Sequence, residues 1–187
     1  MFAVVAIFLL CLMAVSHSAP LTCEDLVRPL DQLDPHDLEG VSWALVAQSL
    51  ELPFKFEGSM TMYFSNTSEA SVYSYTQGNR FKDDQCDYLF YNFTIENGTI
   101  TSNLDRFSSL TGSFLYTSCP DCLVVRFVVG GGYRVSADVY LLSKRRQLEQ
   151  TELDEFGAQM KCLNRNPPDV SDPTKELCPK QTTSSSN

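Results

Sequence analysis

The residues of this sequence that could do chemistry are mostly cysteines. The chain has seven cysteines and only two histidines in 187 residues. A Ser–His or Cys–His nucleophile would have to use His36, because His17 lies in an N-terminal segment that we expect to be removed, and no catalytic motif surrounds His36. One histidine beside cysteines that can all pair makes no zinc site. The sequence therefore predicts no enzyme, no cofactor and no metal centre.

The spacing Cys119-Pro120-Asp121-Cys122 has two interpretations. A redox-active pair needs a helix N-terminus after a strand, which lowers the pKa of the first thiol. Strand-like runs lie on both sides of this motif instead, and this context favours a disulfide at a hairpin tip that stiffens one rim of the fold. The redox pair stays open as the alternative.

Residues 1–18 have the pattern of a cleaved signal peptide. The apolar run 2–15 is too short to span a bilayer, and Ser16-His17-Ser18 after it supplies the small residues of a cleavage site. We expect a single domain over 19–180 and a disordered Ser/Thr tail over 181–187. Loss of Cys11 leaves six of the seven cysteines, and an even count in an oxidising compartment predicts three disulfides. These six are Cys23, Cys86, Cys119, Cys122, Cys162 and Cys178.

Three N-glycosylation sequons fit the same secretory route. They begin at Asn66, Asn92 and Asn97. A glycan on Asn92 must point outward, and since side chains alternate along a strand, Tyr91 and Phe93 must then point inward, together with Leu89 and Ile95.

The acidic composition limits the partners. A net charge of -9 and a pI near 4.6 repel nucleic acid and anionic membranes. No later apolar run is long enough to insert into a membrane. We expect a secreted monomer in plasma or another body fluid.

Eight strand-like runs follow one another with hairpin-length connections, and Asn97-Gly98 is a strong hairpin signal. An irregular or 3₁₀ segment precedes them. The sequence predicts an all-β, eight-stranded, up-and-down antiparallel barrel with one C-terminal α-helix packed outside. The expected strands are 43–50, 55–65, 71–76, 86–95, 99–104, 106–117, 123–129 and 133–142, with a charged loop over 77–84.

The expected helix begins near Thr151, which can cap it, and acidic residues favour its first turn. Gly157 lies beside its apolar face and would allow a close approach to the barrel. That face comprises Leu153, Phe156, Met160 and Leu163.

Gly40 and Trp43 mark the start of the first strand, where the only tryptophan can plug one end of a barrel. Alternating aromatic and thioether side chains either fill such a barrel or line a ligand cavity. Several are tyrosines, which together with an internal Arg126 or Asp138 would suit amphipathic guests. The candidates are Phe56, Met60, Met62, Phe64, Tyr73, Tyr75, Tyr91, Phe93, Phe107, Phe114, Tyr116, Phe127 and Tyr140.

With the Gly and Trp on the first strand, eight strands and a helix, the sequence resembles a lipocalin, and within that family the alpha-1-acid glycoprotein (orosomucoid) branch. The lead-in resembles fish members, a group that includes proteins binding saxitoxin and tetrodotoxin, or tributyltin. The motifs are Leu21-Thr22-Cys23-Glu24, Leu33-Asp34-Pro35, Asp84-Gln85-Cys86, Glu96-Asn97-Gly98-Thr99-Ile100, Val139-Tyr140, Glu155-Phe156 and Cys162-Leu163.

The resemblance implies a carrier of small hydrophobic or amphipathic ligands, a class that includes cationic, toxin-like and xenobiotic-like molecules. The alternative is an acute-phase, immunomodulatory glycoprotein that acts through its surface and glycans, and a third hypothesis is an isomerase with a cysteine in its cavity. The family also implies the disulfides Cys23–Cys162 and Cys86–Cys178.

Two departures from the family pattern carry expectations. The spacing Gly40-Val41-Ser42-Trp43 is one residue longer than usual and predicts a bulge at Val41-Ser42, or else a shifted glycine. Leu142 stands where many lipocalins have an arginine stacked on the tryptophan, with Lys144 and Arg145 the nearest cations. We therefore expect a barrel floor without a cation–π contact.

Overall fold

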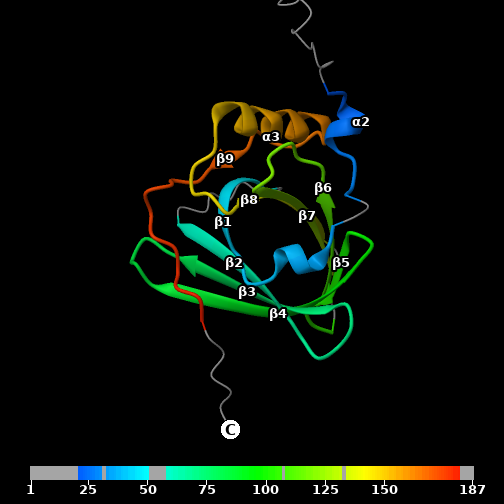
Figure 1. Ribbon diagram of the computed structural model, residues 1–187, viewed down its shortest axis with the longest axis vertical. Coiled ribbons are helices and arrows are strands. Elements are labelled where there is room, and N and C mark those ends of the chain that lie inside the picture. The colour runs from blue at the N-terminus through cyan, green and yellow to red at the C-terminus, as the bar shows by residue number, and fades with distance from the viewer. Residues whose placement is uncertain (1–20, 31–32, 51–57, 107, 132–133, 182–187) are drawn as a thin grey trace, which may run out of the picture.

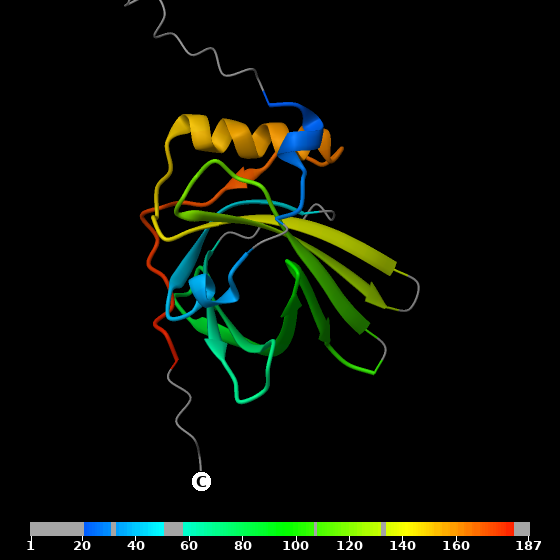
Figure 2. The same cartoon turned by 45° about the vertical axis from the view of Figure 1, so that its right-hand side comes forward.

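A computed structural model describes residues 21–30, 33–50, 58–106, 108–131 and 134–181. In it eight antiparallel strands run in chain order around a barrel, and pairing of β1 with β2 closes the ring (Figures 1 and 2). The predicted eight-stranded barrel is confirmed. The strands are β1 Ser42–Ser49, β2 Ser59–Asn66, β3 Val72–Arg80, β4 Cys86–Glu96, β5 Thr99–Asn103, β6 Ser108–Leu115, β7 Cys122–Gly131 and β8 Arg134–Ser143.

The other elements lie around this barrel. Helix α3 (Gln150–Cys162) packs on its outside, beside the short helix α2 (Cys23–Leu26) (Figure 1). A 3₁₀ helix, η1 (Pro35–Leu38), follows α2, as the polar lead-in predicted. A two-residue strand, β9 (Asp169–Val170), adds to the edge of β1 and was not predicted.

The N-terminal segment closes one end of the barrel. Leu30 N donates to Phe114 O (2.9 Å), Pro29 bridges to Leu115, and Glu39 bridges to Phe64. Leu38 of η1 has no exposed surface and belongs to the interior cluster. The β2–β3, β4–β5 and β6–β7 connections lie at this closed end, and the β3–β4 and β5–β6 connections lie at the other.

Two hydrophobic cores share the wall of the barrel. One fills the interior, and the other lies between α3 and strands β1, β7 and β8. A β-bulge between Leu45 and Ala47 in β1, opposite β8, inserts Val46 as an extra residue. Val46 and Ala47 both consequently pack in the outer core, while Leu45 packs in the inner one.

The bulge predicted at Val41-Ser42 is wrong. The pairing of Ser42, Trp43 and Ala44 with β2 is continuous. The extra residue is taken up before the strand begins, where Gly40 has a φ of +67° that an L side chain rarely adopts.

Helix α3 turns its predicted apolar face to the barrel: Phe156 and Met160 are buried, and Leu153 and Leu163 pack beside them. Its start differs from the prediction. The cap is Glu149, whose backbone N–H donates to Glu152 Oε2 (2.8 Å), and Thr151 lies inside the first turn. The close approach predicted at Gly157 is also wrong, since a Cβ there would meet nothing within 4 Å.

Two disulfides tie the chain ends to the barrel and its helix. Cys23–Cys162 joins α2 to the last residue of α3, and Cys86–Cys178 holds the C-terminal segment against β4. Both pairings are those that the family resemblance implied.

The C-terminal segment crosses the outer face of β2, β3 and β4 as a strap, defined here as residues 176–180. Tyr88 Oη donates to Pro179 O (2.8 Å), and Lys180 Nζ lies 5.5 Å from the Tyr63 ring centroid. Gly78 lies beneath it: a Cβ there would stand 2.9 Å from Cys178 Cβ and 3.1 Å from Tyr88 Cε1. The strap needs a residue without a side chain at this position.

We expect Gly78→Ala to destabilise the fold by roughly 1–3 kcal/mol, because the added methyl overlaps the disulfide strap. The matched substitution Gly157→Ala meets open space inside a helix and should stabilise the fold by about 0.5–1 kcal/mol. Urea denaturation of both variants measures the two effects. Equal effects of the two substitutions would contradict the close packing of the strap.

Candidate functional site: the barrel interior

Most of the predicted lining residues come together inside the barrel. They belong to one buried cluster to which all eight strands contribute, with Trp43 at the closed end. Tyr91 and Tyr140 pack against this cluster and keep partial exposure. Phe56 and Phe107 lie outside the described residues. The predicted residues in the buried cluster are Met60, Met62, Phe64, Tyr73, Tyr75, Phe93, Phe114 and Phe127.

Tyr116 is the exception among the predicted lining residues. It follows the end of β6 at the closed end, where the Arg28 guanidinium lies 5.8 Å from its ring centroid. Its carbonyl accepts from Gln159 Nε2 of α3 (2.6 Å). Tyr116 therefore joins the N-terminal segment to the helix and is not part of the interior cluster.

The interior aromatic rings form a continuous array. Tyr75 and Phe93 stack with centroids 4.6 Å apart and planes 23° apart. Phe93 continues to Phe127 at 6.0 Å, and Phe127 continues to Tyr140 at 5.9 Å, both tilted. These separations lie in the range in which aromatic pairs attract, so the array lines the barrel from β3 across to β8.

A polar row continues from the aromatic array along β3. Tyr75 Oη donates to Gln77 Oε1 (2.7 Å), and Gln77 Nε2 donates to Asn79 Oδ1 (2.9 Å). Alternation along the strand puts all three side chains on the inner face, with Asn79 nearest the end opposite Trp43. Sequence reasoning missed Gln77 and Asn79, because it placed residues 77–80 in a loop. The period-two pattern of Tyr73 and Tyr75, extended by four residues, would have found them.

Tyr140 faces this array from β8. Burial, followed by the charge of Asp138, raises its pKa well above the ordinary tyrosine value. Gln48 of β1 is opposite Tyr140 and is buried. Asp138 lies two residues before Tyr140 and is on the same inner face of β8. Arg126 is exposed on the outer face, so the prediction of an internal Arg126 is wrong.

Trp43 seals the closed end with 3% of its surface exposed. The Nζ atom of Lys144, just beyond β8, lies 5.2 Å from the centroid of its ring. The expectation of a floor without a cation–π contact is therefore wrong: a lysine two residues beyond Leu142 supplies the cation.

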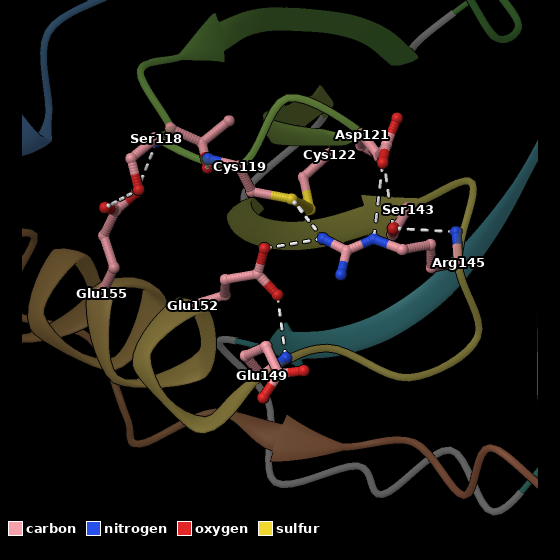
Figure 3. Close-up of polar contacts among 10 residues, drawn as sticks. Ser118, Cys119, Asp121, Cys122, Ser143, Arg145, Glu149, Glu152 and Glu155 are labelled. Carbon is pink, nitrogen blue, oxygen red and sulfur yellow. Dashed lines mark hydrogen bonds and ion pairs between the residues drawn. A yellow bond between two sulfur atoms is a disulfide. The ribbon is translucent and has the colours of Figure 1, made fainter.

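The disulfide Cys119–Cys122 joins the β6–β7 connection to the first residue of β7, beneath α3 at the closed end. Arg145 Nη2 lies 3.2 Å from Cys119 Sγ and donates to Glu152 Oε1 (2.6 Å), and Ser118 Oγ donates to Glu155 Oε2 (2.5 Å) (Figure 3). Hydrogen bonding to Arg145 lowers the pKa of Glu152. Cys122 begins a strand and not a helix, which favours the hairpin disulfide over a redox pair. The rim it stiffens is the closed one.

Residues able to hold a metal do not gather in the described part of the chain: no group of three or more His, Cys, Asp or Glu is placed to bind one. Within the same ranges, no helix is long and apolar enough to cross a membrane.

Comparison with solved structures identifies the fold. Lipocalin 12 from rat epididymis superposes with a TM-score of 0.67 at 15% identity, over 80% of this chain and 91% of that one. The siderocalin Ex-FABP superposes with a TM-score of 0.63 at 14% identity, over 76% and 95%. The chain has the lipocalin fold. No protein-family model and no curated protein matches the sequence.

The outer wall of this lipocalin barrel carries the three sequon asparagines, which are all exposed. Asn92 points outward on β4, while Phe93 and Ile95 are buried inside and Tyr91 is partly buried, as the alternation predicted. Leu89 shares their face but is 40% exposed near the start of the strand.

Two interior tyrosines should make stability fall in alkali. Burial raises the pKa of Tyr75, and that of Tyr140, above the value of about 10 for an unfolded chain. Below about pH 10 the two tyrosines are protonated in both the folded and the unfolded chain, so their contribution to the free energy of unfolding is fully present. Above that pH the unfolded chain loses protons that the folded chain keeps, so the free energy of unfolding falls.

We expect Tyr75→Phe to lose about 1 kcal/mol near neutral pH, with its hydrogen bond to Gln77, and to show a shallower alkaline decline than the unsubstituted protein. Denaturant titrations from about pH 8 to pH 11 measure both changes. Parallel declines in the two proteins would contradict a buried, neutral Tyr75.

Proposed function

We propose that this protein is a secreted carrier that binds small amphipathic molecules inside its barrel. The observation that carries the proposal is the combination, on one inner wall, of an aromatic array with the polar row Tyr75–Gln77–Asn79. Apolar surface provides affinity for the body of a guest, and a few fixed polar groups orient its head. The guest enters at the end of the barrel opposite Trp43.

Partial exposure indicates which inner side chains a guest meets. Phe64, Phe93 and Phe114 are at most 1% exposed and serve as packing. Tyr91, Gln77 and Tyr140 keep accessible surface on the inner face. These three side chains therefore form the contact surface, and the buried rings support them from behind.

The polar groups of the wall favour a neutral or cationic head over an anionic one. Tyr140 stays protonated at physiological pH, so its hydroxyl can both donate and accept. Asp138, beside it, supplies negative charge, and Arg126 is turned away. An amine or guanidinium on an aromatic or aliphatic body suits this combination of rings and carboxylate.

Secretion is supported by features outside the barrel. The run 2–18 has signal-peptide character, three disulfides join six cysteines, and all three sequons are exposed. We propose that the mature chain is a monomeric glycoprotein in an extracellular fluid, within the orosomucoid-like branch that the sequence resembles.

Binding of the neutral arylamine N-phenyl-1-naphthylamine tests the carrier function, because Trp43, the only tryptophan, reports on the barrel interior. We expect saturable probe emission accompanied by quenching of Trp43. Tyr140→Phe should weaken the affinity about two- to tenfold through loss of one hydrogen bond.

Tyr63→Phe is the matched control, since Tyr63 lies on the outer face of β2 under Lys180, and its affinity should stay unchanged. Absence of saturable uptake in the folded, secreted chain would overturn the carrier function. The alternative, a glycoprotein acting through its surface, would then stand.

A further inference from the structure

The outer face of β4 presents four side chains in a row that ends at a sequon. Alternation places Tyr88, Phe90, Asn92 and Thr94 on this face, and Phe90 is 51% exposed. The Tyr88 and Phe90 rings stack, with centroids 6.4 Å apart and planes 20° apart. The hydrogen bond from Tyr88 to Pro179 O fixes the first ring. Two ordered aromatic rings therefore lead up to Asn92 on the surface.

A polar depression adjoins Asn92 on the side of β5 and β6. Pairing of β4 with β5 stops at Thr94 and Thr101, and beyond that point Ser102 Oγ donates to Asn92 O (2.8 Å) in place of a ladder hydrogen bond. The separation of the strands leaves a volume of about 370 Å³. Its lining is mostly hydroxyl and amide side chains: Asn92, Thr94, Thr101, Ser102, Asn103, Ser109, Leu110 and Thr111.

We propose that Asn92 carries an N-linked glycan whose first saccharide packs on the Phe90 ring, with the polar groups of the glycan core facing the depression. The inference rests on the proposed secretion. The amide nitrogen of Asn92 forms a bond to C1 of N-acetylglucosamine and loses a proton. The donor is an oligosaccharide on a polyprenyl diphosphate, and the diphosphate is the leaving group.

The packing has a physical basis in the chemistry of the sugar. One face of a pyranose ring presents C–H groups, which meet the negative face of an aromatic ring favourably and remove its apolar surface from water. Residues two apart on a strand are about 6.8 Å apart, a spacing that a single saccharide can bridge. Among the described ring contacts, only Tyr88 stacks on Phe90. The saccharide therefore gives the Phe90 ring a second partner.

A second sequon has the same spacing and a different environment. Phe64 stands two residues before Asn66, as Phe90 stands before Asn92. Phe64 is 1% exposed and packs inside the barrel, so its ring is out of reach of a glycan. At Asn97 the corresponding residue is the buried Ile95. Only Asn92 combines a sequon with an accessible ring.

The test uses the full chain secreted from a eukaryotic cell line. Peptide mass spectrometry measures occupancy at each asparagine, and denaturant unfolding measures the effect of each glycan. Removing the Asn92 glycan by Asn92→Gln should raise the unfolding equilibrium constant roughly three- to tenfold when Phe90 is present. In a Phe90→Thr background the same removal should change it little, and Phe90→Tyr should restore the effect.

Asn66→Gln serves as the matched control, and its effect should be the same with Phe90 or Thr at position 90. A secreted chain with Asn66 or Asn97 occupied and Asn92 empty would overturn this inference alone, as would an equal effect of Asn92→Gln in both backgrounds. A secreted chain without glycan on any sequon would overturn it as well, whereas absence of the folded chain from the culture medium would instead refute the proposed secretory route. Probe uptake by the barrel is measured separately, so the carrier function does not depend on either outcome.

Discussion

The bulge in β1 between Leu45 and Ala47 lets one strand serve two hydrophobic cores. A regular strand sends alternate side chains to opposite faces and could not turn Val46 and Ala47 to the same side. With the bulge, Leu45 packs inside the barrel, while Val46 and Ala47 pack on the outside, in the core beneath α3. Gln48 is then returned to the inner face opposite Tyr140. The helix, the closed barrel and the lining of the interior thus all depend on one inserted residue.

The interior and exterior of the barrel divide the work of the protein. Inside, buried rings hold Tyr91, Gln77 and Tyr140 in place. The Tyr140 hydroxyl, whose pKa is raised by burial, is protonated and can both donate and accept a hydrogen bond. Outside, the disulfide strap and α3 cover separate parts of the wall. Part of β4 stays open to solvent, with an aromatic ring beside a sequon. The proposed ligand and the proposed glycan therefore lie on opposite faces of the same sheet.

Sequence patterns predicted the barrel because the alternation of apolar residues and the turn residues between strands are local signals. The even number of cysteines in addition predicted the three disulfides. Such patterns failed where a contact between distant segments decides the outcome. Tyr116 has inward parity but follows the end of its strand, where it contacts Arg28. Gln77 and Asn79 were assigned to a loop because they are polar, although they continue the period-two pattern of Tyr73 and Tyr75 on the inner face. Lys144 reaches Trp43 across the closed end, a contact that spacing from Tyr140 did not reveal.

Two sequons show where the sequence stops and the tertiary structure takes over. Phe64 and Phe90 each stand two residues before a sequon asparagine, and the sequence alone places each of them on a strand, on the same face as that asparagine. It also determined the class of fold, since eight alternating runs and one amphipathic helix have few other ways to bury their apolar surface. Alternation along the strands already indicated that Phe64 points inward and that Phe90 shares the outward face of Asn92. Only the tertiary structure decided how far each ring is covered, because neighbouring strands bury Phe64 to 1% exposure while no described segment covers Phe90 to a comparable extent, and Phe90 is 51% exposed.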